Sequence, residues 1–261
     1  FSTVEPFGKT LKLKLQNAAA NIELLGVRYT LNGEVEVVED AFYINNLPVK
    51  DEDGNTASLV GQIYHKNFDK WDYNMNFNFE DDISKRDPQA PYRNLPLERF
   101  LVMKTTYKQG DYYYGKAYAR GTANISGYGN KMDVTVDVET KTGTLITFPM
   151  YGASDLDEEE NFIQFVSKTD PLANLKEKID FTGVNLDMKF KITPEAKLKI
   201  VFNEQLGDEI LAYGSGDIDF TFDAYNNMYL EGKYTLTKGS NYNFAMGPIK
   251  QKFDILDLEV L

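Results

Sequence analysis

Few side chains in this sequence have the chemistry that catalysis requires. The 261 residues include one histidine, His65, and no cysteine. A catalytic base needs a hydrogen-bonded partner, and the sequence names none for His65, so we predict a structural histidine beside a turn. Ser215, in Gly214-Ser215-Gly216, lacks the strand-turn-helix setting of a nucleophile elbow. Asp217, Asp219 and Asp223 lack the apolar surroundings of a glycosidase acid. We therefore expect no enzyme activity and no cofactor.

Two acidic runs are compatible with metal binding but are better explained without it. Asp51-Glu52-Asp53-Gly54-Asn55 resembles the start of a calcium loop, yet Gln62 stands where an EF-hand needs its twelfth-position glutamate. We predict an exposed hairpin turn there. Asp157-Glu158-Glu159-Glu160 reads as the solvated start of a helix, so no metal site is expected.

The tyrosines from Tyr112 to Tyr118 leave a carbohydrate-binding alternative open. Tyr112, Tyr113, Tyr114 and Tyr118 lie close enough in sequence to form a sugar-stacking platform. Aromatic residues are equally common as packing residues of a sheet, which is the interpretation we favour.

Strict alternation of apolar and polar residues dominates the chain and predicts strands with one apolar and one solvated face. It is clearest between residues 186 and 244 and recurs through residues 9–148, so we predict an all-β antiparallel meander of about 12–16 strands. Asn32-Gly33 predicts a two-residue hairpin turn. The apolar positions of residues 186–236 are Leu186, Met188, Phe190, Leu198, Ile200, Phe202, Ile218, Phe220, Phe222, Met228, Leu230, Tyr234 and Leu236.

Two segments break this alternation. Residues 81–97 contain three prolines and predict an irregular loop. Ser154 to Ser167 has a capping residue, acids in its first turn and an apolar stripe, so we predict a short helix near 155–167 within an insertion at 154–179.

Composition narrows the environment in which the protein works. A net charge of −12 argues against nucleic acid and against anionic headgroups as partners. No run approaches the ~20 apolar residues of a membrane span. Because the chain starts at Phe1, we expect a fragment of a longer protein, with residues 1–261 forming one domain. Its apolar face either closes into a barrel or sandwich or stays open as a half-pipe, and alternation alone does not separate these shapes.

The stretch from Ile192 to Phe244 resembles the C-terminal domain of the TamB family, within the AsmA/TamB bridge-like lipid transfer superfamily. The resemblance is carried by Ile192-Thr193-Pro194-Glu195-Ala196, Phe202-Asn203-Glu204, Gly207-Asp208, Gly214-Ser215-Gly216, Gly232, Gly239 and Tyr242-Asn243-Phe244, and it is strongest to the Bacteroidetes type. Gly61, His65 and Phe68 resemble a G-x-x-x-H-x-x-F element of such proteins.

The resemblance implies a β-taco, a half-pipe with an apolar lumen that the thirteen alternating residues above would line as a lipid groove. It also implies a periplasmic, outer-membrane-associated domain of a protein anchored in the inner membrane. The expected role is to carry phospholipid acyl chains and support outer-membrane biogenesis. The alternative is a scaffold for outer-membrane protein assembly that works with an Omp85-family (TamA/BamA-like) barrel through β-augmentation.

Overall fold

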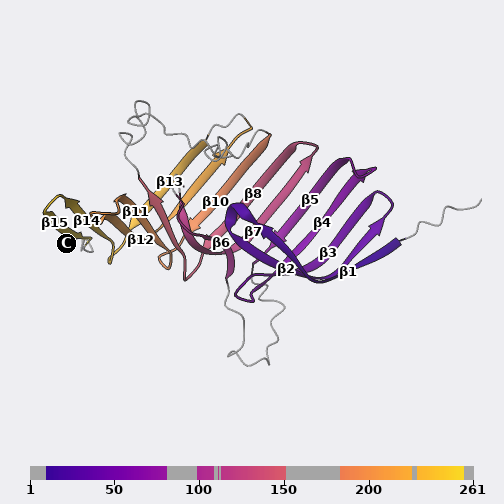
Figure 1. Cartoon of the computed structure of the whole chain (residues 1–261), viewed down its shortest axis with the longest axis horizontal. Helices are drawn as coiled ribbons and strands as arrows, with labels where there is room; N and C mark the ends of the chain where they lie inside the picture. The colour runs from indigo at the N-terminus through magenta and orange to yellow at the C-terminus, as the bar shows by residue number, and fades with distance from the viewer. Residues whose placement is uncertain are drawn as a thin grey trace, which may run out of the picture.

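The computed structural model describes residues 10–80, 99–108, 111, 113–150, 183–224 and 228–255. They form one 15-stranded sheet whose strands follow one another along the longest axis, from β1 at one end to β15 at the other (Figure 1). The all-β prediction is confirmed. The elements are β1 (Thr10–Ile22), the 3-10 helix η1 (Glu23–Leu25), β2 (Val27–Val38), β3 (Ala41–Lys50), β4 (Thr56–Lys66), β5 (Lys70–Asn78), β6 (Phe100–Thr105), β7 (Tyr114–Tyr128), β8 (Lys131–Thr140), β9 (Leu145–Pro149), β10 (Val184–Ile192), β11 (Lys197–Asn203), β12 (Asp208–Phe222), β13 (Met228–Leu236), β14 (Asn241–Met246) and β15 (Ile249–Asp254).

The sheet is mixed, so the prediction of a purely antiparallel meander was wrong at one junction. β10 pairs parallel with β8, and β11 pairs parallel with β9. Parallel neighbours need a crossover connection, because the chain must return to the same end of the sheet before the second strand begins. The predicted helix near 155–167, its insertion at 154–179 and the loop at 81–97 lie outside the described residues.

Several short strands are halves of longer ones that are interrupted at a corner. β8 and β9 both pair with β7, and β10 and β11 both pair with β12. β13 and β14 likewise share β12. The interruptions, at residues 141–144, 193–196 and 237–240, add residues opposite an uninterrupted strand. Such bulges bend a sheet and increase its twist.

Buried hydroxyl groups replace the missing backbone hydrogen bonds at these corners. The Oγ1 atom of Thr144 accepts a hydrogen bond from the backbone N–H of Tyr118 and donates one to its carbonyl oxygen, both at 3.0 Å. The Oγ atom of Ser240 makes the same pair of bonds with Tyr213, both at 2.9 Å. Because buried backbone groups must be paired, these hydroxyls allow the strands to break without leaving orphan donors. The two corners share the sequence Lys-Gly-Ser/Thr, with one extra residue, Thr142, in the first.

The Asn32-Gly33 pair does not form the predicted hairpin turn. β2 runs through both residues, and the chain reverses instead at Gly26, with a φ of 62°, and at Glu39-Asp40. Neighbouring strands carry extra residues here, with register shifts beside Leu15 and beside Ile44. The side-chain Oδ1 of Asn32 accepts a hydrogen bond from the backbone of Asn17 at 2.8 Å. Asn32 and Gly33 thus lie inside β2, at a position where its pairing with the neighbouring strands is irregular.

A dry core lies where the ends of β2, β3 and β4 meet β6. The ring of Tyr29 stacks on Phe100 with centroids 5.3 Å apart, and its hydroxyl donates to the carbonyl oxygen of Leu101 at 3.0 Å. Burial raises the pKa of Tyr29 well above its usual range, with the nearby Asp51 and Glu52 charges adding to the effect. The buried members of the core are Val27, Tyr29, Val35, Ile44, Leu47, Val49, Ala57, Leu59, Phe100, Leu101 and Tyr118.

The turn between β3 and β4, residues 51–55, is hydrogen-bonded to this core. The prediction of an exposed turn was wrong for its first and last residues. Asp51 and Asn55 are only 6% and 7% exposed. The Asp51 carboxylate accepts hydrogen bonds from the backbone N–H groups of Asn55 and Leu101, both at 2.8 Å, and of Asp53 at 3.0 Å. Because N–H donors already surround this carboxylate, a cation would have to displace them. Leu101 lies fifty positions along the chain, so local sequence could not reveal the burial.

The same turn carries two exposed ion pairs to the next strands. Glu52 pairs with Lys104, and Asp53 pairs with Lys116 and accepts a hydrogen bond from the Tyr118 hydroxyl. The Tyr118 hydroxyl and Lys116 hold the pKa of Asp53 below its usual value, against a smaller opposing effect of desolvation. Lys104 and the backbone of Arg28 do the same for the pKa of Glu52.

These depressed pKa values predict acid sensitivity. A carboxylate with a lowered folded-state pKa contributes stability above its unfolded pKa of about 4, and that contribution is lost as the pH falls through the folded pKa. We expect the urea midpoint to drop between pH 6 and pH 3, and Asp53→Asn to reduce the size of that drop. Asp254→Asn, on exposed β15, is the control and should leave the pH dependence as it is. An equal drop in Asp53→Asn and wild type would contradict the assignment.

Candidate functional site

Apolar side chains form unbroken rows that cross the strands along the length of the sheet. Cross-strand partners point to the same face, so the register of the paired strands identifies each row. One row contains Leu13, Val35, Ile44, Gly61, Met75, Ile125, Val134, Leu186 and Phe222, with Met228 at the next register position. A second contains Leu47, Leu59, Phe77, Ala123, Val136, Met188, Phe220 and Leu230. We call the part of these rows on β5, β7, β8, β10, β12 and β13 the apolar strip.

The apolar strip is half-buried, unlike the dry core beside it. On β5, β8, β10 and β12, residues on this face are of intermediate exposure and alternate with exposed polar residues. The main packing between elements that are not sheet neighbours brings β6 against β2 and η1, within the dry core. At one end of the strip Leu230 is 68% exposed. The strip is therefore a large apolar surface that stays partly open to solvent among the described residues.

The predicted groove residues fall into two groups. Leu186, Met188 and Phe190 stand opposite Phe222, Phe220 and Ile218, and these stand opposite Met228, Leu230 and Gly232. Tyr234 and Leu236 continue the same face of β13, opposite Gly216 and Gly214. The structure thus brings together ten of the thirteen, which are Leu186, Met188, Phe190, Ile218, Phe220, Phe222, Met228, Leu230, Tyr234 and Leu236.

The other three lie beyond the corner at residues 193–196. Leu198 and Ile200 pair with Ala212 and Ile210, at the far half of β12. Phe202 lies at the register shift between Val201 and Asn203, and its ring meets Tyr242 edge-on, with centroids 6.1 Å apart. These residues extend the apolar face around the bend. The groove residues predicted from the sequence did not include any on β5, β7 or β8, although the same alternation of apolar and polar residues runs through these strands.

Glycines mark this face as the crowded one. The glycines inside β4, β7, β12 and β13 all lie on the same face of the sheet as the apolar-strip and core residues. They are Gly61, Gly115, Gly121, Gly127, Gly214, Gly216 and Gly232. A Cβ atom at Gly61 would lie 2.4 Å from the carbonyl oxygen of Asn74, and one at Gly216 would lie 2.0 Å from that of Lys233. Strand glycines mark close backbone approach and tight bends. The backbones of neighbouring strands therefore approach each other most closely on the apolar face.

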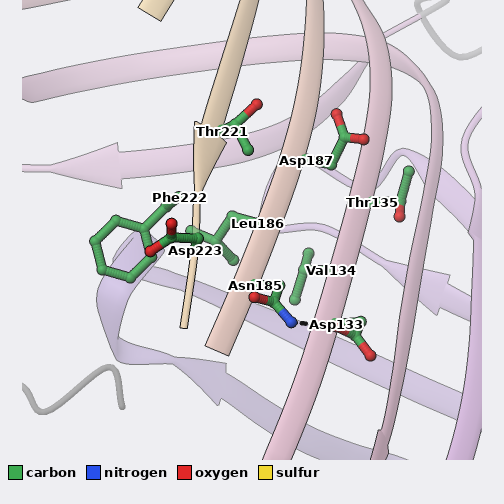
Figure 2. A pocket seen from close by; sticks show the side chains of 9 residues that line it. All are labelled: Asp133, Val134, Thr135, Asn185, Leu186, Asp187, Thr221, Phe222 and Asp223. Atoms are coloured by element: carbon green, nitrogen blue, oxygen red, sulfur yellow. Dashed lines mark hydrogen bonds between the residues drawn. The ribbon is translucent and has the colours of Figure 1, made fainter. Parts of the chain in front are cut away.

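A small depression lies at the ends of β8, β10 and β12 (Figure 2). Its volume is about 160 Å³, and its lining includes Asp133, Asp187 and Asp223. The amide of Asn185 donates to Asp133 at 2.6 Å (Figure 2). Ligand pockets usually measure ~300–1,000 Å³. This depression is too small for such a ligand, and no described group of three or more His, Asp or Glu residues could hold a metal ion.

His65 and Tyr118, the two other candidate residues, are both buried. His65 is the penultimate residue of β4, beside the turn at residues 67–69, as predicted, and is 5% exposed; its ring stacks on that of Phe68 with centroids 4.0 Å apart. Tyr118 is buried under the guanidinium of Arg99, 4.0 Å from the ring centroid. Tyr118 is thus a packing residue rather than part of an open sugar platform. Tyr112 lies outside the described residues.

Comparison with known proteins identifies the family. The family model of the TamB C-terminal domain matches residues 45–257. No curated protein and no solved structure matches the chain. In the described part of the chain, no helix is both long and apolar enough to cross a membrane.

The close approach at the glycines of the apolar face predicts a steric cost for a single methyl group. We expect Gly61→Ala to destabilise the fold by about 1–3 kcal/mol, because the backbone of Asn74 and Met75 must move. Gln62→Ala, exposed on the opposite face, should change stability by less than about 0.5 kcal/mol. Chemical denaturation measures both, and equal stability of the two variants would show that the apolar face is not crowded.

Proposed function

Because the chain belongs to the family of the TamB C-terminal domain, we propose that its sheet is a half-pipe whose apolar strip carries phospholipid acyl chains between the inner and outer membranes. In this proposal residues 1–261 act as one non-enzymatic domain in the periplasm. The full-length protein is anchored in the inner membrane and supports outer-membrane biogenesis.

The observation that carries the proposal is the continuity of the apolar rows. The apolar strip crosses from β5 to β13, and at ~4.8 Å per strand this is a path of about 24 Å. One leaflet of a bilayer is about 15 Å of hydrocarbon, half of the ~30 Å core. A surface longer than one acyl chain is suited to passing lipids along it rather than to holding one.

The chemistry of the strip also suits movement. Each methylene that leaves water contributes about 0.8 kcal/mol, and the strip repeats similar apolar side chains from strand to strand. A lipid can therefore exchange one set of contacts for the next at little net cost. Contiguous apolar surface that stays open to solvent usually marks a site for an apolar partner, which supports an apolar occupant. Headgroups remain at the open side, in water.

Phe220 provides the sharpest test. It lies on the second row between Met188 and Leu230, so Phe220→Asp would place a charge in the path of the acyl chains and should abolish phospholipid co-purification. Thr221→Asp introduces the same charge on the polar face and should leave lipid binding intact. Native mass spectrometry with lipid extraction measures the lipid, and circular dichroism checks folding. Lipid-free wild-type protein, or equal lipid in both variants, would count against the conduit.

A second candidate function is a scaffold for outer-membrane strands, favoured by the edge at β13. Within the described chain, β13 pairs only with β12, and its nine residues keep a regular register. Tyr229 and Leu230 are 55% and 68% exposed. A long regular strand with an unpaired edge is a template for β-augmentation. The proposed partner is a strand of an Omp85-family barrel of the TamA/BamA type.

The absence of native cysteine makes this candidate directly testable. Tyr229→Cys should form disulfide crosslinks to single cysteines placed along the edge strand of the barrel, in a ladder that follows antiparallel or parallel register. Tyr43→Cys, on the same polar face but within the interior strand β3, is the matched control and should not crosslink. Equal or absent crosslinking in both variants, with the barrel present, would reject the augmentation model.

A further inference from the structure

The end of the β4–β5 hairpin has features that the packing of the sheet does not explain. The backbone N–H of Asp69 donates to the carbonyl oxygen of Lys66 at 3.1 Å, and Asn67 and Phe68 between them have φ values of 54° and 58°. This is a turn with two left-handed residues, in which glycine is strongly preferred at the second position. A bulky residue at positive φ is a true outlier. Phe68 occupies that position and is 69% exposed.

Behind Phe68 lies a buried donor without a partner. The Nδ1 atom of His65 accepts a hydrogen bond from the backbone N–H of Phe68 at 3.3 Å. The proton of the neutral ring is therefore on Nε2, which is buried and has no hydrogen-bond partner among the described residues. The ring contacts Phe42, Phe68 and Trp71, with centroids 5.6, 4.0 and 5.3 Å away. Buried polar groups are normally satisfied, so this one invites an acceptor from outside the chain.

Two lysines close the hairpin directly opposite each other. Lys66 and Lys70 are cross-strand partners, both exposed, and neither forms an ion pair with an acid in the described part of the chain. Like charges directly opposite are destabilising, and an anion between them relieves the repulsion. The two lysine side chains start on the polar face of the sheet. Because they lie at the end of the hairpin, their flexible aliphatic stems can reach around that end to the apolar face.

The chemistry changes in a fixed order from the turn toward the strip. The cross-strand pairs on the apolar face run from His65 and Trp71 to Ile63 and Tyr73, and then to Gly61 and Met75. Outermost are the lysines. This spatial order matches the order of groups in a glycerophospholipid. The cations correspond to its phosphate, the hydrogen-bond donor among aromatic rings to its ester carbonyls, and the apolar side chains to its acyl chains.

We propose that residues 65–71 are the headgroup subsite of the apolar strip, where Lys66 and Lys70 meet the phosphate and His65 donates to an ester carbonyl. Phe68 covers the glycerol region, which is why its strained backbone is retained. This inference rests on the proposed function, because the acyl chains of the same lipid must lie on the strip.

Trp71 is the only tryptophan of the chain, so its fluorescence reports on the subsite alone. The probes are phosphatidylcholines with bromine atoms either close to the ester or at the chain end, supplied from phosphatidylcholine vesicles. Bromine near the ester should quench Trp71 more strongly than bromine at the chain end. Equal quenching, or none while lipid still co-purifies, would overturn the subsite and leave the conduit standing. If no phospholipid co-purifies or binds, both proposals fail.

Two variants separate recognition from packing. Lys66→Glu combined with Lys70→Glu should weaken phosphatidylcholine binding about tenfold without changing binding of the corresponding diacylglycerol. Phe68→Gly relieves the turn, so the fold should become more stable while phospholipid affinity falls. Lys250→Glu combined with Lys252→Glu, at the other end of the sheet, is the charge-matched control and should bind normally. Unchanged affinity in both hairpin variants would show that the hairpin end has only a packing role.

Discussion

The fold depends on cross-strand register, which keeps the apolar rows on one face. Because side chains alternate with a period of two, a slip of one residue in any strand would turn that strand's apolar residues to the polar face. β7 and β12, with fifteen residues each, remain uninterrupted, and the broken strands β8–β9, β10–β11 and β13–β14 align on them. Both halves of each broken strand stay in register with one continuous partner, so the rows continue past every corner.

Curvature follows from how the corners and glycines are distributed. Extra residues at the corners bend the sheet locally, and glycines on the apolar face allow the backbones of neighbouring strands to approach closely there. Thr144 and Ser240 satisfy the backbone where the ladder breaks, so the bend leaves those polar groups paired. The polar face stays solvated by alternating charge: Lys189 stands between Asp137 and Asp219, and Lys191 between Glu139 and Asp217.

The apolar face of the sheet is covered to different extents along its length. Toward β2 and β6 the face closes into a dry core, fastened by the Asp51 carboxylate and its N–H donors. Toward β12 and β13 the same alternation is left half-open. The closed core and the half-open strip therefore lie on the same face of one sheet.

The sequence by itself determined the strand period, the strand class and the shared apolar face, because side-chain alternation is a local property that needs no knowledge of the partner strand. It also located the turn beside His65 and the residues from Leu186 to Phe222 that meet across β10 and β12. Only the tertiary structure decided the parallel pairing of β8 with β10, since pairing direction depends on a crossover rather than on either strand. It likewise decided the burial of Asp51, whose partner Leu101 is remote in sequence, and the continuation of β2 through Asn32-Gly33. Burial and pairing depend on which strand, distant in sequence, lies beside a given strand in the fold. The alternation of apolar and polar residues within one strand does not specify that neighbouring strand.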